Sequence, residues 1–125
     1  MKTKFTYVGI RVKDIGESVQ FYTKVLGMKE TGRSRIDIAK GDVVNLASED
    51  DAFTLELNAY DKGSEYDTEY SVGEGLDHLA FQVEDLDDFI EEAKAMGYPV
   101  AAEMKTKKSR WVYIKDPNGI WIEIF

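Results

Sequence analysis

The chain has 125 residues, of which 43% are hydrophobic and 32% charged, and its net charge is −8. This composition predicts a globular domain with a buried core, and it argues against nucleic acids and anionic membranes as partners, because both bind basic surfaces. The chain lacks cysteine, a membrane-length apolar run and a signal-peptide hydrophobic region, so we expect a cytoplasmic protein without disulfides or thiolate metal ligands.

The first half of the chain is predicted to begin with a strand and a helix. The strand is expected at residues 5–12 (FTYVGIRV), where the pattern alternates. Asp14 and Glu17 have the spacing of a helix start, with the aspartate capping the first exposed N–H groups. Gly27 suits the left-handed conformation that ends a helix. The apolar face of this helix is expected at Val19, Tyr22, Val25 and Leu26.

Three more strands are expected in this half. They lie near 30–38, at 43–48 (VVNLAS) and at 53–60 (FTLELNAY). The first module is therefore expected over about 4–60, and a long polar connection, residues 60–76, follows it.

The second half repeats the order of a strand and then a helix. The strand is expected at 78–83 (HLAFQV), the helix is expected to start at Asp85 with Asp88 three residues on, and Gly97 is expected to end it. The apolar face of this second helix is expected at Leu86, Phe89, Ile90, Ala93 and Met96.

Three strands are expected to complete this half as well. They lie near 99–104, at 110–115 (RWVYIK) and at 120–125 (IWIEIF), with DPNG (116–119) as the turn between the last two. The second module is expected over about 76–125.

The fold class predicted from this repeat is α+β. Two tandem βαβββ modules are expected to form one domain over residues 1–125, a curled mixed sheet of two half-barrels with the helices outside. Aligning Val12 with Val83 places Tyr7 on His78, the only histidine in the chain. The repeated pattern therefore carries a tyrosine once and a histidine once.

Strand alternation gives the first and last strand of each module an apolar face and a mixed face. On the mixed faces lie Tyr7, Glu56, His78 and Glu123, and the two glutamates are equivalent under the repeat. If the strands curl into half-barrels, all four side chains face the hollow. The apolar faces are expected to carry Val8, Ile10 and Val12; Phe53, Leu55 and Leu57; Leu79, Phe81 and Val83; and Ile120, Ile122 and Ile124.

A glutamate within an apolar strand has to be paired, protonated, hydrated or bound to a metal, because burying an unpaired carboxylate costs at least several kcal/mol. Two glutamates and a histidine that converge on a cavity suit a divalent cation. The alternative is that each glutamate faces water on an open sheet and that His78 is structural. The correspondence of these positions under the repeat favours a functional site.

Three segments carry a resemblance to the vicinal oxygen chelate superfamily, which includes glyoxalase I, bleomycin-resistance proteins and extradiol dioxygenases. They are RVKDIGESVQFYTKVLGMK (11–29), LDHLAFQVEDL (76–86) and KDPNGIWIEIF (115–125). Within this superfamily the chain is most similar to bacterial-type glyoxalase I, through FYTKVLGMK, LELNAY, DHLAF and DPNGIWIEI.

The resemblance implies an activity and a ligand set. Glyoxalase I isomerises the hemithioacetal of methylglyoxal and glutathione to lactoylglutathione, by proton transfer through a metal-stabilised enediolate. Its metal ligands are His, Glu, His and Glu from four strands, which implies Glu56, His78 and Glu123 as ligands here and Glu123 as the base. The first histidine is replaced by Tyr7, a phenol that is ordinarily protonated near pH 7. The shift toward oxygen favours manganese, magnesium, iron or nickel over zinc without identifying the ion.

Four other residues are candidates for contact with the substrate. Arg11 matches the arginine that in glyoxalase I helps to hold a glutathione carboxylate, whereas Tyr60 stands where an asparagine is expected, which argues against glutathione. Trp111, Tyr113 and Trp121 offer stacking surfaces.

Other functions within the superfamily are left open. One is a metal-free binding protein of the bleomycin-resistance type, in which these aromatic residues and Tyr7 bind a cationic ligand. Another is a fosfomycin-modifying enzyme. Extradiol dioxygenases are disfavoured because they need two histidines. Small members of the superfamily are usually homodimers, so we expect a homodimer that binds a small molecule. The two modules can pair within one chain or across the dimer. In the second case Tyr7 and Glu56 of one subunit complete a site with His78 and Glu123 of the other.

Overall fold

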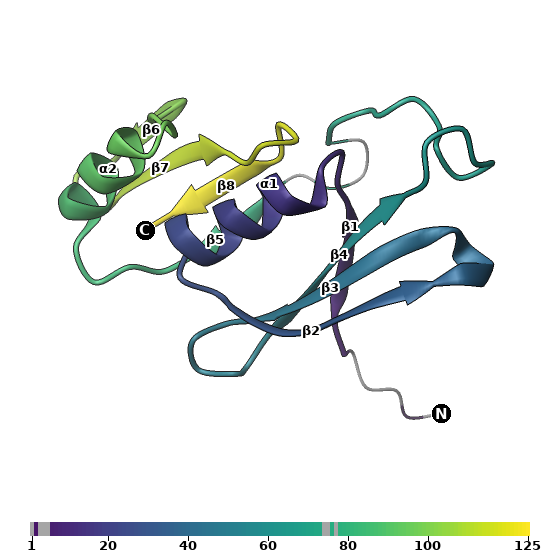
Figure 1. Ribbon diagram of the computed structural model, residues 1–125. Coiled ribbons are helices and arrows are strands. Elements are labelled where there is room, and N and C mark those ends of the chain that lie inside the picture. Colours follow the sequence, from purple (N-terminus) through teal and green to yellow (C-terminus); the bar gives the residue numbers. More distant parts are fainter. Residues whose placement is uncertain (1, 3–5, 74–75, 77) are drawn as a thin grey trace. The chain divides into compact units, whose positions relative to one another are not determined.

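The computed structural model describes residues 2, 6–73, 76 and 78–125. The chain divides into two compact units, Met1–Tyr70 and Ser71–Phe125, which are described separately. Each unit contains a helix and a four-stranded mixed sheet, so the α+β class and the two βαβββ modules are confirmed (Figure 1).

The first unit follows the predicted order of elements. It is built of β1 (Val8–Arg11), α1 (Ile15–Gln20), a π-helical turn (Phe21–Val25), β2 (Lys29–Ile36), a short 3-10 helix (Asp37–Ala39), β3 (Gly41–Ala47) and β4 (Thr54–Tyr60). In its sheet the strand order is β1-β4-β3-β2, and only the β1–β4 pair is parallel.

The second unit repeats this topology. It is built of β5 (Leu79–Phe81), α2 (Leu86–Ala95), β6 (Ala102–Lys105), β7 (Arg110–Lys115) and β8 (Trp121–Ile124). The strand order is β5-β8-β7-β6, again with one parallel pair, β5–β8. Parallel neighbouring strands need a crossover connection. In each unit the helix lies within that connection, α1 between β1 and β4 and α2 between β5 and β8.

Both helices begin at the predicted aspartates. The Asp14 side chain accepts a hydrogen bond from the Glu17 N–H (2.8 Å), and the Asp85 side chain accepts one from the Asp88 N–H (2.9 Å). Such caps satisfy donors that have no partner within the helix. Gly97 follows α2 with a φ of 95°, a left-handed conformation that glycine adopts without steric cost.

The segment predicted as the first helix is regular α-helix only as far as Gln20. After Gln20 the helix widens, because the Leu26 N–H bonds the carbonyl five residues back, at Phe21 (3.3 Å). Phe21 and Tyr22 are almost fully buried and contact each other edge to face at 5.0 Å. The helix packs against β3 and β4, whose buried residues form the core of this unit: Val44, Leu46, Leu55 and Leu57.

Two predicted core positions are wrong. Phe53 was expected on the apolar face of a strand, but it precedes β4 and is 75% exposed, because its backbone closes the β3–β4 turn with Ser48. Met96 was expected on the apolar face of α2, but it lies beyond the last helical residue, Ala95, and is 51% exposed. Both residues lie just outside the element whose periodicity would have buried them.

The predicted DPNG turn is confirmed between β7 and β8. Asp116 Oδ1 accepts hydrogen bonds from the N–H groups of Asn118 and Ile120, both 2.8 Å long, and Asp116 and Asn118 are buried. This turn fixes the start of β8. The core of the second unit consists of fully buried strand residues: Val112, Ile114, Ile122 and Ile124.

The polar segment after β4 is bound to the first unit as far as Tyr70. Asp61 pairs with Arg35, Glu65 with Lys40 (3.2 Å), and Thr68 accepts hydrogen bonds from Arg11. These contacts explain why the boundary between the compact units falls after Tyr70 rather than at the end of the last strand.

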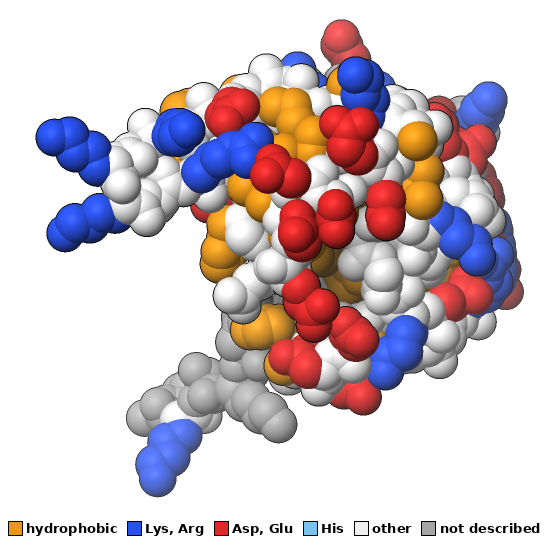
Figure 2. Space-filling view, turned by 90° about the vertical axis from the view of Figure 1, so that its left-hand side faces the viewer, with side chains coloured by type: hydrophobic (Ala, Val, Ile, Leu, Met, Phe, Trp, Pro, Cys, Tyr) orange, Lys and Arg blue, Asp and Glu red, His pale blue; other side chains and the backbone are white. Residues whose placement is uncertain are grey.

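The surface carries many charged side chains, as the composition predicts. Figure 2 shows acidic and basic side chains exposed on the surface. None of the helices that the structure describes is long and apolar enough to cross a membrane.

Candidate functional site

His78 and Glu123 form a close pair in the second unit. His78 immediately precedes β5 and Glu123 lies within β8, where its partner in the parallel register is Ala80. The distance from His78 Nε2 to Glu123 Oε2 is 2.9 Å. The two side chains are 33% and 22% exposed, so the pair is partly desolvated but accessible to a ligand. An imidazole nitrogen and a carboxylate oxygen thus meet at one point on the sheet.

A row of aromatic rings extends from this pair across the sheet. Tyr113 lies opposite Glu123 in the β7–β8 register, and its ring meets that of His78 edge to face at 5.7 Å. The Trp121 ring in turn meets Tyr113 edge to face at 5.8 Å. Lys115 places its ammonium 4.6 Å from the centre of the Trp121 ring, a cation–π contact. The row of rings therefore leads from His78 and Glu123 to Trp121, the first residue of β8.

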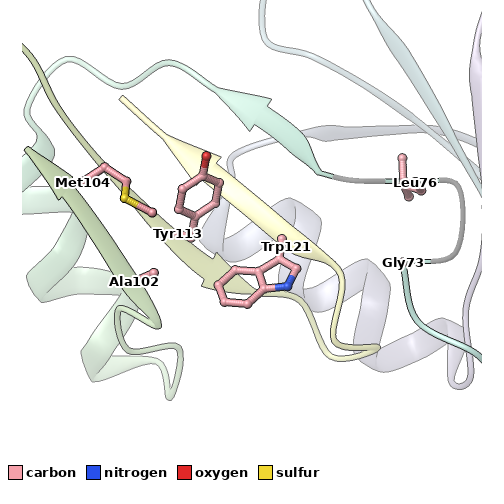
Figure 3. Close-up of a pocket in the computed structure, with 6 residues that line it drawn as sticks. All are labelled: Gly73, Leu76, Ala102, Met104, Tyr113 and Trp121. Atoms are coloured by element: carbon pink, nitrogen blue, oxygen red, sulfur yellow. The ribbon is translucent and has the colours of Figure 1, made fainter.

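A cavity of about 420 Å³ lies on the same face of this sheet. Figure 3 shows Met104, Tyr113 and Trp121 projecting from β6, β7 and β8 toward a common space. Its wall is completed by Gly73, Leu76 and Ala102. Tyr113 belongs both to the wall and to the row of rings, so the cavity adjoins the His78–Glu123 pair.

The equivalent face of the first unit carries Tyr7 and Glu56. Glu56 lies in β4 opposite Gly9 of β1, and a Cβ atom placed on Gly9 would lie 4.0 Å from both Glu56 Oε1 and the Tyr7 ring. The same Cβ would lie 3.4 Å from Asn58 Nδ2, so the carboxylate of Glu56 and the phenol of Tyr7 both lie beside Gly9. Within the part of the chain that the structure describes, the Glu56 side chain has neither a hydrogen bond nor an ion pair.

The structure thus brings the four predicted metal ligands together as two pairs. Tyr7 and Glu56 lie on the first unit, and His78 and Glu123 lie on the second. Among the described residues, no three or more histidine, aspartate or glutamate side chains are grouped closely enough to hold a metal ion. Each unit supplies two candidate donors.

Arg11, the predicted substrate contact, is held within its own unit. Its guanidinium donates to the hydroxyl and carbonyl oxygens of Thr68 (3.1 and 2.5 Å) and lies 3.6 Å from Asp67. Its charge also lies 5.5 Å from the centre of the Tyr70 ring, whose hydroxyl donates to the Arg11 carbonyl. A role for Arg11 in binding a substrate carboxylate stays a prediction, and it requires these contacts to be exchanged.

The sequence analysis identified part of the cavity wall. Tyr113 and Trp121 line the cavity, whereas Trp111 does not. Met104, Ala102, Leu76 and Gly73 were missed. The alternation of Ala102 and Met104 along a strand was the available signal, since residues two apart share a face. No local pattern identifies Leu76, which lies in the connecting segment.

Known proteins are similar to this chain over nearly its whole length. The sequence profile of the Glyoxalase/Bleomycin resistance protein/Dioxygenase superfamily matches residues 4–124. The chain is 33% identical to a lactoylglutathione lyase of Neisseria meningitidis, over 91% of this chain and 83% of that protein. It is 30% identical to a lactoylglutathione lyase of Arabidopsis thaliana, over 97% of this chain but 43% of that protein, so it spans less than half the length of the plant relative.

Solved structures of known proteins have a similar fold. The trypanothione-dependent glyoxalase I of Leishmania major superposes with a TM-score of 0.78 at 28% identity, over 98% of this chain and 86% of that one. The matched range, residues 4–124, covers both units. The chain belongs to the glyoxalase/bleomycin resistance protein/dioxygenase superfamily.

Proposed function

We propose that this protein is a metal-dependent isomerase or lyase of the glyoxalase I type, in which Glu123 transfers a proton between adjacent carbons of a small substrate. The observation that carries the proposal is the 2.9 Å distance between His78 Nε2 and Glu123 Oε2 on an accessible sheet face. Relatives named lactoylglutathione lyase at 30–33% identity support the reaction class.

The geometry of the pair is compatible with a divalent ion. Ligand atoms bound about 2.1 Å from an ion and at right angles to each other are about 3 Å apart. The His78 and Glu123 donor atoms already have that spacing. The donors that the resemblance adds are the carboxylate of Glu56 and the phenol of Tyr7. Their participation stays a prediction, as does the homodimer in which two chains would share such sites.

The proposed chemistry assigns separate roles to the two residues of the pair. A bound divalent ion would draw electron density from two adjacent substrate oxygens and so acidify the neighbouring C–H bond. Glu123 takes this proton on its carboxylate and returns it to the adjacent carbon. His78 Nε2 and Glu123 Oε2, 2.9 Å apart, would hold the ion, while Glu123 Oε1, which has no hydrogen bond or ion pair among the described residues, is left to carry the proton.

The first test is calorimetric titration of nickel, zinc, manganese and magnesium, separately, into protein stripped with chelator. Binding of at least one ion is expected, with loss in His78→Ala and no change in Glu84→Gln, an exposed glutamate outside both pairs. Glu123→Gln should retain its melting temperature and lose the isomerase turnover of the wild-type protein, assayed both with methylglyoxal hemithioacetals and with small α-hydroxyketones. Absence of binding by any ion, or full turnover by Glu123→Gln, would remove the proposed mechanism.

The aromatic cavity favours a second candidate, a metal-free binding protein of the bleomycin-resistance type. Tyr113 and Trp121 in its wall offer stacking surfaces, and a volume of about 420 Å³ is within the range of small-molecule sites. This candidate predicts saturable quenching of tryptophan fluorescence by a cationic aromatic drug that is unchanged after chelator treatment. The isomerase predicts a metal requirement instead.

A further inference from the structure

We infer that the cavity of the second unit binds a flat, uncharged aromatic ring, so that the substrate is a small aryl-substituted compound with two adjacent oxygens. The inference deepens the proposed function and rests on it for the reacting end of the substrate. The binding of the ring rests on the cavity alone.

The wall of the cavity has the chemistry of a ring-binding site. Its described lining residues are two aromatic side chains, Tyr113 and Trp121, together with a thioether, Met104, and the small or aliphatic residues Gly73, Leu76 and Ala102. None of these carries a charge. Aromatic rings favour edge-to-face and offset contacts with other rings, and a thioether packs well against a ring edge.

The cavity wall and the surroundings of the His78–Glu123 pair share one residue, Tyr113. The centre of its ring lies 5.7 Å from that of the His78 ring and 5.8 Å from that of the Trp121 ring. A ligand ring that packs against Tyr113 in the cavity is therefore next to the residue that contacts His78. A compact substrate, with its adjacent oxygens close to the ring, suits this arrangement.

The charges around the cavity disfavour other ligand classes, including the cationic ligand of the second candidate function. Lys115 already places an ammonium 4.6 Å from the centre of the Trp121 ring, so a second cation on this indole would meet like-charge repulsion. Glutathione carries two carboxylates and an ammonium, for which the apolar wall offers no partner. Arg11, the side chain expected to hold a glutathione carboxylate, is engaged with Thr68 and Asp67 in the first unit. A neutral aryl group meets neither obstacle.

The test compares two α-hydroxyketones that differ only in the ring. In chelator-treated protein labelled with ¹³C-methyl methionine, 2-hydroxyacetophenone should shift the Met104 methyl resonance in a saturable manner. Hydroxyacetone, which has a methyl group in place of the phenyl ring, should bind at least about tenfold more weakly, because it buries much less apolar surface. The Met96 methyl resonance should not move, since Met96 lies outside the cavity.

Two methionine substitutions form a matched pair. Met104 and Met96 are 45% and 51% exposed, so a glutamate at either position is tolerated by the fold. Met104→Glu places a carboxylate in the cavity wall and should weaken binding of 2-hydroxyacetophenone at least about tenfold. Met96→Glu should leave it unchanged. Nickel binding should be the same in both variants.

Three results would overturn the inference: equal affinity for the two ketones, an unmoved Met104 resonance at saturation, or tighter binding of S-lactoylglutathione with the same shift at Met104. Failure of the proposed function has a different signature, since ring binding would persist while no metal bound and Glu123→Gln changed nothing. Conversion of 2-hydroxyacetophenone to its aldehyde isomer by the metal-loaded protein, lost in Glu123→Gln, supports both proposals.

Discussion

Glu56 and Glu123 occupy the same register position in their two sheets. Glu56 lies between Gly9 of β1 and Asn45 of β3, and Glu123 lies between Ala80 of β5 and Tyr113 of β7. The internal repeat therefore holds at the level of individual strand pairings. What differs is the neighbour of each carboxylate: a phenol beside Glu56, and an imidazole beside Glu123.

This asymmetry predicts the effect of restoring an imidazole to the first unit. Tyr7→His should raise the affinity for nickel or zinc by at least about tenfold, because imidazole is a better ligand than a protonated phenol. Tyr7→Phe should weaken metal binding little. Competition calorimetry on the stripped protein measures both variants.

Tyr66→His is the matched control for this substitution. Tyr66 is 44% exposed and Tyr7 50%, but Tyr66 packs near Tyr60 rather than beside Glu56. An equal gain in Tyr66→His would mean that the added imidazole binds metal on its own. No gain in metal affinity in Tyr7→His would show that position 7 is not part of the metal site.

A second prediction concerns the segment that follows β4. Arg11→Ala should lower the hydrogen-exchange protection of the Asp67 amide, which bonds the Ser64 carbonyl, by roughly tenfold. The reason is the loss of charge-assisted hydrogen bonds to Thr68, worth about 1.5–3 kcal/mol in typical cases. Arg33→Ala, which removes a contact with Glu30 on β2, should leave this amide unchanged. Equal protection in wild type and Arg11→Ala would show that Arg11 does not hold the segment.

A third prediction uses two glycines of the first sheet. Gly41 is buried at the start of β3, and a Cβ there would lie 2.8 Å from the Ala59 carbonyl oxygen, a backbone atom that cannot turn away. Gly41→Ala should therefore destabilise the protein by about 1–3 kcal/mol. A Cβ on Gly32 meets no atom within 4 Å, so Gly32→Ala should stay within about 0.5 kcal/mol of wild type. Urea unfolding distinguishes the two, and equal stability of the variants would contradict the packing argument.

Local patterns in the sequence predicted the helix starts and the strand faces. Asp14 and Asp85 cap their helices because a side-chain oxygen and an N–H group three residues on are close in any helix start. Glu56 and Glu123 were placed on matching faces because strand side chains alternate with a period of two residues. These relations depend only on neighbours in the chain.

Contacts between distant residues could not be predicted in this way. Arg11 and Thr68 are separated by 57 positions, and nothing near Arg11 in the sequence indicates that its partner lies in a polar connecting segment. The cavity wall combines residues from three strands and that segment, so Leu76 was missed. Phe53 and Met96 were misplaced because periodicity does not mark where an element ends.

The last prediction concerns acid stability. Asp61 accepts hydrogen bonds from Arg35, and this contact, together with the positive charge of the guanidinium, lowers the pKa of Asp61 below its ordinary value. Since the folded-state pKa is the lower one, the pair stabilises the fold at pH values above the unfolded-state pKa of about 3.9. That contribution is lost as the pH falls through the folded-state value, where Asp61 becomes protonated.

Asp61→Asn should therefore lower the melting temperature at pH 7, by no more than a few degrees because the pair is solvent-exposed and screened. The difference in melting temperature from wild type should shrink as the pH falls below about 4. It should also shrink at pH 7 in 1 M salt, where the screening length is about 3 Å. Glu49→Gln removes an exposed carboxylate that has no ion pair among the described residues, and it should show no such pH dependence. A constant difference between Asp61→Asn and wild type from pH 7 to pH 2.5 would mean that the asparagine acts through packing rather than through the lost charge.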